Sequence, residues 1–88
     1  MPQRYRIHIR QRAVKALRSL PAPDKRRIRN AIDKLADDPR PPGVRKLADK
    51  HQLYRLRIGY YRIIYQIKDR ELLVLVVNVG HRRDIYRR

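Results

Sequence analysis

Residues 53–67 read LYRLRIGYYRIIYQI, in which apolar and polar side chains alternate on both sides of Gly59 and Tyr60. This alternation is typical of two strands joined by a two-residue β-turn. A glycine at the first turn position favours a type II′ turn, whose twist suits a tight antiparallel hairpin. A two-residue turn also fixes the register, which predicts that Arg57 lies directly opposite Arg62.

This register divides the side chains of the hairpin between two faces. One face carries Arg55, Arg57 and Arg62, and the other is apolar, with Tyr54, Leu56, Ile58, Tyr61, Ile63 and Tyr65. Like charges directly opposite each other cost up to about 1 kcal/mol. The arginine face therefore fits either a solvated strand surface or a site for a polyanion, since the planar guanidinium fork matches phosphate oxygens.

The first half of the chain predicts one strand and two helices. Residues 4–10 alternate like a half-buried strand, and residues 11–20 then have the apolar spacing of a helix. Pro21 and Pro23 are expected to end this first helix, and a second helix is predicted over about residues 24–37. Two helices joined by a proline turn form a helical hairpin.

The second half predicts a sheet. Residues 38–52 are rich in proline and are expected to be irregular, whereas residues 72–79 form a nearly continuous apolar run that indicates a central strand ending at Gly80. Segregated helices and strands are typical of an α+β fold, here a helical hairpin on an antiparallel sheet completed by a three-stranded C-terminal meander. We expect residues 1–88 to form a single domain.

Charge limits the partners. The chain has 24 Lys and Arg against 8 Asp and Glu, a formal net charge of +16. Such a surface favours nucleic acid, or an acidic protein that covers it. The chain has no cysteine, and its three histidines lack metal-ligand spacing, so neither a metal nor a cofactor is expected. No apolar run approaches the roughly 20 residues of a membrane span, so a soluble cytoplasmic protein is expected.

The available side chains limit the chemistry. With one serine, no threonine and few carboxylates, the chain lacks the groups of a serine hydrolase or a metal hydrolase. Guanidinium, phenol and imidazole suit cleavage of RNA, in which arginines stabilise the charge that builds on the phosphate. Tyr86 beside Arg82 and Arg83 is a candidate base, because positive charge favours the phenolate, and His81 is a candidate acid or base. On composition alone, plain RNA binding remains the alternative.

Three stretches resemble the RelE/ParE superfamily of bacterial toxins from toxin–antitoxin pairs: DDPRPPGVRKL at 37–47, LYRLRIGYYRIIYQI at 53–67 and VNVGHRRDIY at 77–86. The combination of YRIIY with VGHRRDIY resembles the RelE side of the superfamily in particular. The resemblance implies a RelE-like fold, similar to microbial ribonucleases. It also implies an mRNA interferase that enters the ribosomal 30S A site, where attack by the RNA 2′-hydroxyl leaves a 2′,3′-cyclic phosphate and a 5′-hydroxyl.

The resemblance also implies roles for individual residues. Arg55 and Arg57 match two basic positions of the family on the first meander strand, and Arg62 matches the arginine of the next strand. The implied catalytic residues are Arg62, Arg82 and Tyr86, with His81 as a helper. The resemblance implies that Arg55 and Arg57 bind RNA and phosphate. Independently of it, the basic charge of the tail and of the loop adds Arg83, Arg45 and Lys46 as candidate phosphate-binding residues, with the loop either bordering a substrate groove or simply connecting back to the sheet.

The chain departs from the family pattern at two points. The best-known member has lysines where this chain has Arg55 and Arg57, and arginine stays protonated, so neither residue can take part in proton transfer. The segment between Gly80 and Tyr86 is also shorter than in that member. His81 gains weight as a helper for this reason, and whether Tyr86 or His81 is the general base stays open.

The partners follow from the charge and the resemblance. An antitoxin is expected to wrap an acidic or amphipathic segment over this domain and to fold as it binds. The toxin alone is expected to be a monomer, and its antitoxin complex a higher-order assembly. Two alternatives stay open: a ParE-like toxin that inhibits DNA gyrase without cleaving, and a non-catalytic RNA- or ribosome-binding module.

Overall fold

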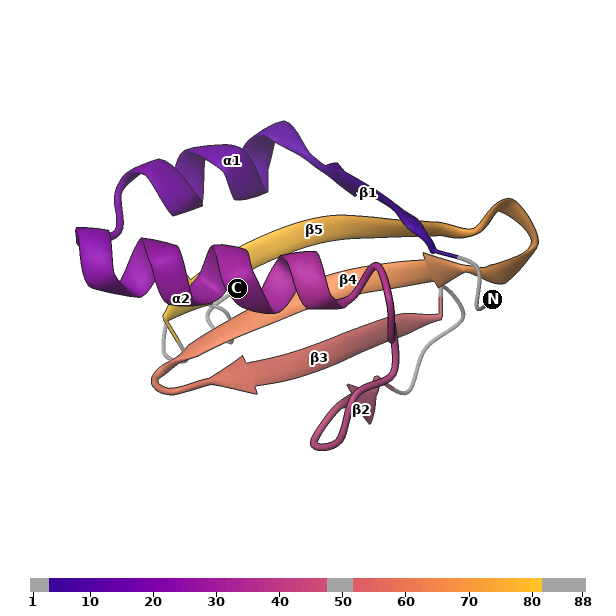
Figure 1. Cartoon of the computed structure of the whole chain (residues 1–88). Helices are drawn as coiled ribbons and strands as arrows, with labels where there is room; N and C mark the ends of the chain where they lie inside the picture. Colours follow the sequence, from indigo (N-terminus) through magenta and orange to yellow (C-terminus); the bar gives the residue numbers. More distant parts are fainter. Residues whose placement is uncertain (1–3, 48–51, 82–88) are drawn as a thin grey trace.

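The computed structural model describes residues 4–47 and 52–81. Its elements in chain order are β1 (Arg6–Ile9), α1 (Gln11–Arg18), α2 (Ala22–Lys34), β2 (Arg45–Lys46), β3 (Leu53–Ile58), β4 (Tyr61–Lys68), a short 3-10 helix η1 (Asp69–Glu71) and β5 (Leu73–His81). The strands form one sheet in the order β1-β5-β4-β3-β2, and both helices lie over one face of it (Figure 1). The predicted α+β class is confirmed.

The β3–β4 hairpin has the register that its sequence predicts, with Arg57 paired to Arg62. Gly59 has a φ of +60°, while Tyr60 lies outside the left-handed region, as a type II′ turn requires. The hairpin therefore needs no long-range contact to fix its register, because the turn and the side-chain alternation agree.

The core lies between the helices and the apolar face of the sheet. Its buried residues are Ala13, Leu17, Ile28, Ile32, Leu35, Tyr54, Leu56, Ile63, Tyr65, Ile67, Val74, Val76 and Val79. Because side chains alternate along a strand, burial of this face turns Arg55, Arg57 and Arg62 to the side away from the helices. Within the described ranges, no helix is long and apolar enough to cross a membrane.

The helix boundaries differ from those predicted. α1 ends at Arg18, and hydrogen bonds from Ser19 N–H to Ala16 and from Leu20 N–H to Leu17 close its last turn. Pro23 does not separate the helices but lies in the first turn of α2, where its missing N–H has no intrahelical partner to lose. α2 ends at Lys34, earlier than expected, and the chain continues in turns.

β5 is an interior strand, as its apolar sequence predicts, although β4 is the middle strand of the five. β1 pairs with it in parallel and β4 in antiparallel fashion, so the sheet is mixed at its β1 edge. The prediction that Gly80 ends the strand was wrong, because Gly80 pairs with Arg62 and β5 continues to His81. Gly80 therefore sets no side chain across from Arg62.

Candidate functional site

A pocket of about 250 Å³ is lined by Gly43, Arg45, Arg55, Arg57 and Arg62. Across neighbouring strands Arg45 pairs with Arg55, and Arg57 pairs with Arg62. Among the described residues that line this arginine pocket, none is acidic. Two directly opposed pairs of like charges are unfavourable without an anion between them. The pocket therefore suits a polyanion such as a nucleic-acid backbone, in which each successive phosphate diester carries one negative charge.

Arg62 is the most enclosed of the four arginines. Its residue surface is 8% exposed, and its Nε and Nη1 atoms are fully buried. Arg55 is half-buried, and Arg45 and Arg57 are exposed. Charges attract an anion more strongly where solvent is partly excluded, so Arg62 is the residue best suited to respond to charge that develops on a bound phosphate.

The loop after α2 brings Arg45 to the sheet. Pro41–Val44 form a turn closed by a 3.1 Å hydrogen bond from the Val44 N–H to the Pro41 carbonyl, and Gly43 has a φ of +90°. A proline followed by a glycine in the left-handed region defines a type II turn. The prediction that residues 38–52 are wholly irregular was wrong, because β2 pairs with β3 directly after this turn.

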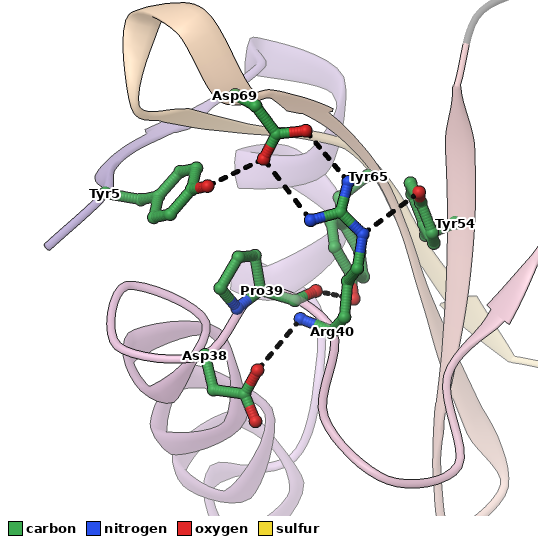
Figure 2. Close-up of polar contacts among 7 residues, drawn as sticks. All are labelled: Tyr5, Asp38, Pro39, Arg40, Tyr54, Tyr65 and Asp69. Carbon is green, nitrogen blue, oxygen red and sulfur yellow. Dashed lines mark hydrogen bonds and ion pairs between the residues drawn. The ribbon is translucent and has the colours of Figure 1, made fainter. Parts of the chain in front are cut away.

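A group of four side chains, the Arg40 cluster, holds the start of this loop (Figure 2). Arg40 donates from Nη1 and Nη2 to the two carboxylate oxygens of Asp69, at 3.3 and 2.9 Å, and from Nε to the Tyr54 hydroxyl at 3.2 Å. The Tyr5 hydroxyl also donates to Asp69, at 2.6 Å. The cluster thus ties the loop to β3, to the residue before β1 and to the β4–β5 connection.

The structure describes six of the predicted site residues. Four of them meet in the arginine pocket: Arg45, Arg55, Arg57 and Arg62. Lys46 is exposed on β2 opposite Tyr54 and does not line the pocket. His81 ends β5 opposite Tyr61, and its ring contacts Tyr60 and Tyr61 instead. Outside the described residues lie Arg82, Arg83 and Tyr86.

Known proteins resemble the chain along most of its length. Residues 7–86 match the sequence profile of the family described as "ParE toxin of type II toxin-antitoxin system, parDE". The chain is 30% identical to a RelE-like toxin protein of Escherichia coli, over 94% of this chain and 90% of that protein. It belongs to the RelE/ParE toxin superfamily.

Solved structures of RelE/ParE toxins agree with this assignment. A chain of the archaeal RelE–RelB complex from Pyrococcus horikoshii OT3 matches with a TM-score of 0.81 and 34% identity, over 93% of this chain and 97% of that chain. A chain of the intact E. coli RelBE toxin–antitoxin complex matches with a TM-score of 0.76 and 25% identity, over 88% of this chain and 95% of that chain. The resemblance stated from the three sequence motifs is confirmed.

Two features of this RelE/ParE toxin escaped the sequence analysis. The Arg40 cluster joins Tyr5 to Asp69, which are 64 residues apart in the chain. The one signal for it in the sequence is Asp69 itself, a carboxylate in a predicted turn of a very basic chain. The other feature is Tyr60, which is 68% exposed. A large aromatic side chain at a tight turn was a signal that could have found it.

The Arg40 cluster predicts a pH dependence of stability. Hydrogen bonds from Arg40, and then from Tyr5, hold the pKa of Asp69 below its ordinary value. Its carboxylate therefore stabilises the fold above the unfolded pKa of about 3.9, and this contribution is lost as the pH falls through the folded pKa. We expect Asp69→Asn to be less stable than the wild type at neutral pH, with a difference that shrinks below about pH 4.

Urea unfolding of the wild type and of Asp69→Asn, at neutral pH and at about pH 3, measures this effect. The matched control is Asp33→Asn, which removes an exposed carboxylate outside the cluster. A stability difference for Asp69→Asn that is equal at both pH values would show that the ionised carboxylate is not the stabilising group.

Proposed function

We propose that this toxin cleaves mRNA in the A site of the translating ribosome. In this reaction the RNA 2′-hydroxyl attacks the adjacent phosphate and the 5′-oxygen leaves, which gives a 2′,3′-cyclic phosphate and a 5′-hydroxyl. The observation that carries the proposal is the convergence of Arg45, Arg55, Arg57 and Arg62 on one pocket. The relationship to a RelE-like toxin over nearly the whole chain supports it.

The four arginines would divide the work by their burial. The exposed and half-buried arginines bind the phosphates on either side of the cut. Arg62, the most enclosed, stabilises the extra negative charge of the transition state. Arg82 matches the arginine that the family places after the last strand, and joins Arg62 in this role.

The proton of the 2′-hydroxyl needs a separate acceptor, because arginine stays protonated. Tyr86 and His81 are the two candidates. Tyr61 and His81 pair directly, so their side chains lie on the face of the sheet that packs against the core, whereas the Arg62 side chain lies on the opposite face. Because the His81 side chain lies on the face opposite Arg62, we favour Tyr86 as the base and give His81 a supporting role.

Primer extension on a translated mRNA tests the proposal. The purified toxin is added to a translation reaction and, in parallel, to the same mRNA without ribosomes. We expect cuts inside codons only when ribosomes translate, with 5′-hydroxyl ends that a polynucleotide kinase can label. Cuts without ribosomes would contradict ribosome dependence.

The assay also separates the alternatives. A toxin that leaves the mRNA intact but blocks supercoiling by DNA gyrase would act as a ParE-like toxin, the first of the two alternatives. A protein that binds RNA or ribosomes without cuts and without any effect on gyrase would be a non-catalytic binding module.

We further propose an antitoxin with an acidic amphipathic segment as the partner. A groove of about 930 Å³ runs between α1 and the outer face of β5. Its apolar residues include Leu73, Leu75 and Val77, and its exposed basic residues are Arg10, Arg12, Lys15 and Arg18. An apolar surface bordered by positive charge is complementary to such a segment. The similar solved chains come from RelE–RelB complexes, which supports a partner of this kind.

The groove predicts a charge-reversal phenotype. We expect Arg12→Glu combined with Lys15→Glu to weaken binding of the neighbouring-gene product by about tenfold or more, because both exposed side chains would repel an acidic segment. Copurification and titration measure this affinity, and growth rescue should fail while toxicity persists. The matched control is Arg26→Glu with Arg29→Glu on α2, also exposed. Equal affinity for both double variants would exclude the groove.

A further inference from the structure

Three aromatic rings gather where β3, β4 and β5 meet at one end of the sheet. The rings of Tyr60 and His81 lie nearly parallel, at 11°, with centroids 6.2 Å apart. The His81 ring meets the Tyr61 ring edge-on, at 83° and 5.7 Å. Within the described part of the chain, Tyr60 is the one large hydrophobic side chain that is exposed, at 68%. Its ring is thus supported by a second ring and still open to solvent.

Two guanidinium groups flank the turn that carries this ring. Arg57 donates a 3.4 Å hydrogen bond from Nε to the Gly59 carbonyl. Nη2 of Arg27 comes within 3.3 Å of the position that a β-carbon at Gly59 would occupy, and the same nitrogen contacts Asp24 at 3.1 Å. Arg57 also lines the arginine pocket, so the pocket and the aromatic turn share one side chain.

We propose that Tyr60 is an RNA base-stacking residue. Its ring, held on one side by His81, presents its open side to a nucleobase, while Arg57 and Arg27 bind the adjoining phosphates. Proteins that bind single-stranded RNA combine aromatic stacking surfaces with arginines in this way. Every base has a π-face, so this contact positions the RNA chain without selecting a sequence.

The proposal rests on the proposed function for its ligand, because that function is what makes RNA the occupant. Arg57 contacts the turn and also lines the pocket, so Tyr60 would bind a nucleotide close along the chain to the one whose phosphate lies in the arginine pocket, on an RNA strand that passes around the end of the hairpin. Its role is to orient the RNA strand, so it is a positioning residue. Base stacking also explains a tyrosine at a turn where a small polar residue would otherwise suffice.

A binding assay that needs no cleavage tests this role. The probe is a short single-stranded RNA with 2′-O-methyl groups that block cleavage and with 2-aminopurine as a fluorescent base, used alone and as the A-site codon of programmed ribosomes. We expect Tyr60→Phe to bind like the wild type and to quench 2-aminopurine equally. Tyr60→Ala and Tyr60→Leu should bind about 5- to 100-fold more weakly, because neither provides a ring.

Binding of Tyr60→Ala within about twofold of the wild type, in both formats, would overturn the proposal. Loss of affinity for the antitoxin alone would overturn it as well, since the ring would then serve a protein contact. If Tyr60→Ala lowers the affinity for ribosomes but leaves the quenching of 2-aminopurine unchanged, the stacked base belongs to ribosomal RNA. That result supports the proposal, with ribosomal RNA in place of mRNA as the source of the base.

The two proposals fail in different ways. A wild-type toxin that cuts no mRNA but shows Tyr60-dependent quenching would refute the cleavage function and leave the stacking residue in place. If Tyr60→Ala cuts mRNA and binds the probe as well as the wild type does, the cleavage function stands and the stacking role of Tyr60 is refuted. Because Tyr60 is exposed, its substitution should leave the melting temperature unchanged.

Discussion

Arg62→Ala is expected to abolish growth arrest and to lower the rate of ribosome-dependent mRNA cleavage by about 10²- to 10³-fold. Arg62 is the most enclosed of the four pocket arginines, at 8% exposure. Water has little access to this position, so it would compensate poorly for the positive charge that the variant loses. Growth curves after induction and single-turnover primer extension measure the two effects. From the family resemblance, Arg82→Ala should have an effect of the same kind.

Three comparisons make the Arg62 prediction specific. Arg29→Ala removes the same charge from an exposed site on α2 and should keep full activity. Arg62→Lys keeps the charge without the planar donor fork, so we expect an intermediate rate. Thermal unfolding should show that Arg62→Ala is folded, because the change also removes its like-charge pairing with Arg57. Full toxicity of a folded Arg62→Ala variant would remove Arg62 from the site.

Tyr65→Ala is expected to destabilise the fold by about 3–5 kcal/mol, the usual cost of removing a large buried aromatic ring. The Tyr65 side chain is fully buried in the centre of the core, and its ring stacks on Tyr54 with centroids 5.9 Å apart. A domain of this size has a free energy of unfolding of about 5–15 kcal/mol, so the variant should be partly unfolded near its working temperature. Urea or thermal unfolding followed by circular dichroism measures the loss.

Tyr65→Phe separates packing from hydrogen bonding at the same position. The Tyr65 hydroxyl donates a 2.7 Å hydrogen bond to the Pro39 carbonyl (Figure 2), and burial raises the pKa of this hydroxyl, which keeps it protonated as a donor. Loss of this one bond should cost about 1 kcal/mol. A Tyr65→Phe variant as unstable as Tyr65→Ala would show that the hydrogen bond, and not the ring, is the main contribution.

The Tyr65 bond also links stability to the site. Pro39 begins the loop that carries Gly43 and Arg45 into the arginine pocket, and Arg40, the next residue, is held by Asp69 and Tyr54. Tyr65→Phe should therefore lower mRNA cleavage more than its small loss of stability predicts, since the loop would be less well fixed beside the phosphate.

The sequence by itself determined the β3–β4 hairpin and the face that carries Arg55, Arg57 and Arg62. Both follow from local rules, because a two-residue turn sets the pairing and alternation assigns each side chain to a face. The family could also be recognised, since its motifs are runs of neighbouring residues. Helix boundaries were less well predicted, because Pro23 is compatible with both the end of one helix and the first turn of the next.

Only the tertiary structure decided which distant residues meet. Nothing in the local pattern of residues 4–10 pairs β1 in parallel with β5, and no local rule brings Arg45 across from Arg55 or Arg40 to Asp69. These contacts join segments far apart in the chain, and their geometry is set by how the helices pack on the sheet. The arginine pocket thus combines a face that the sequence predicts with a loop that only the folded chain can place.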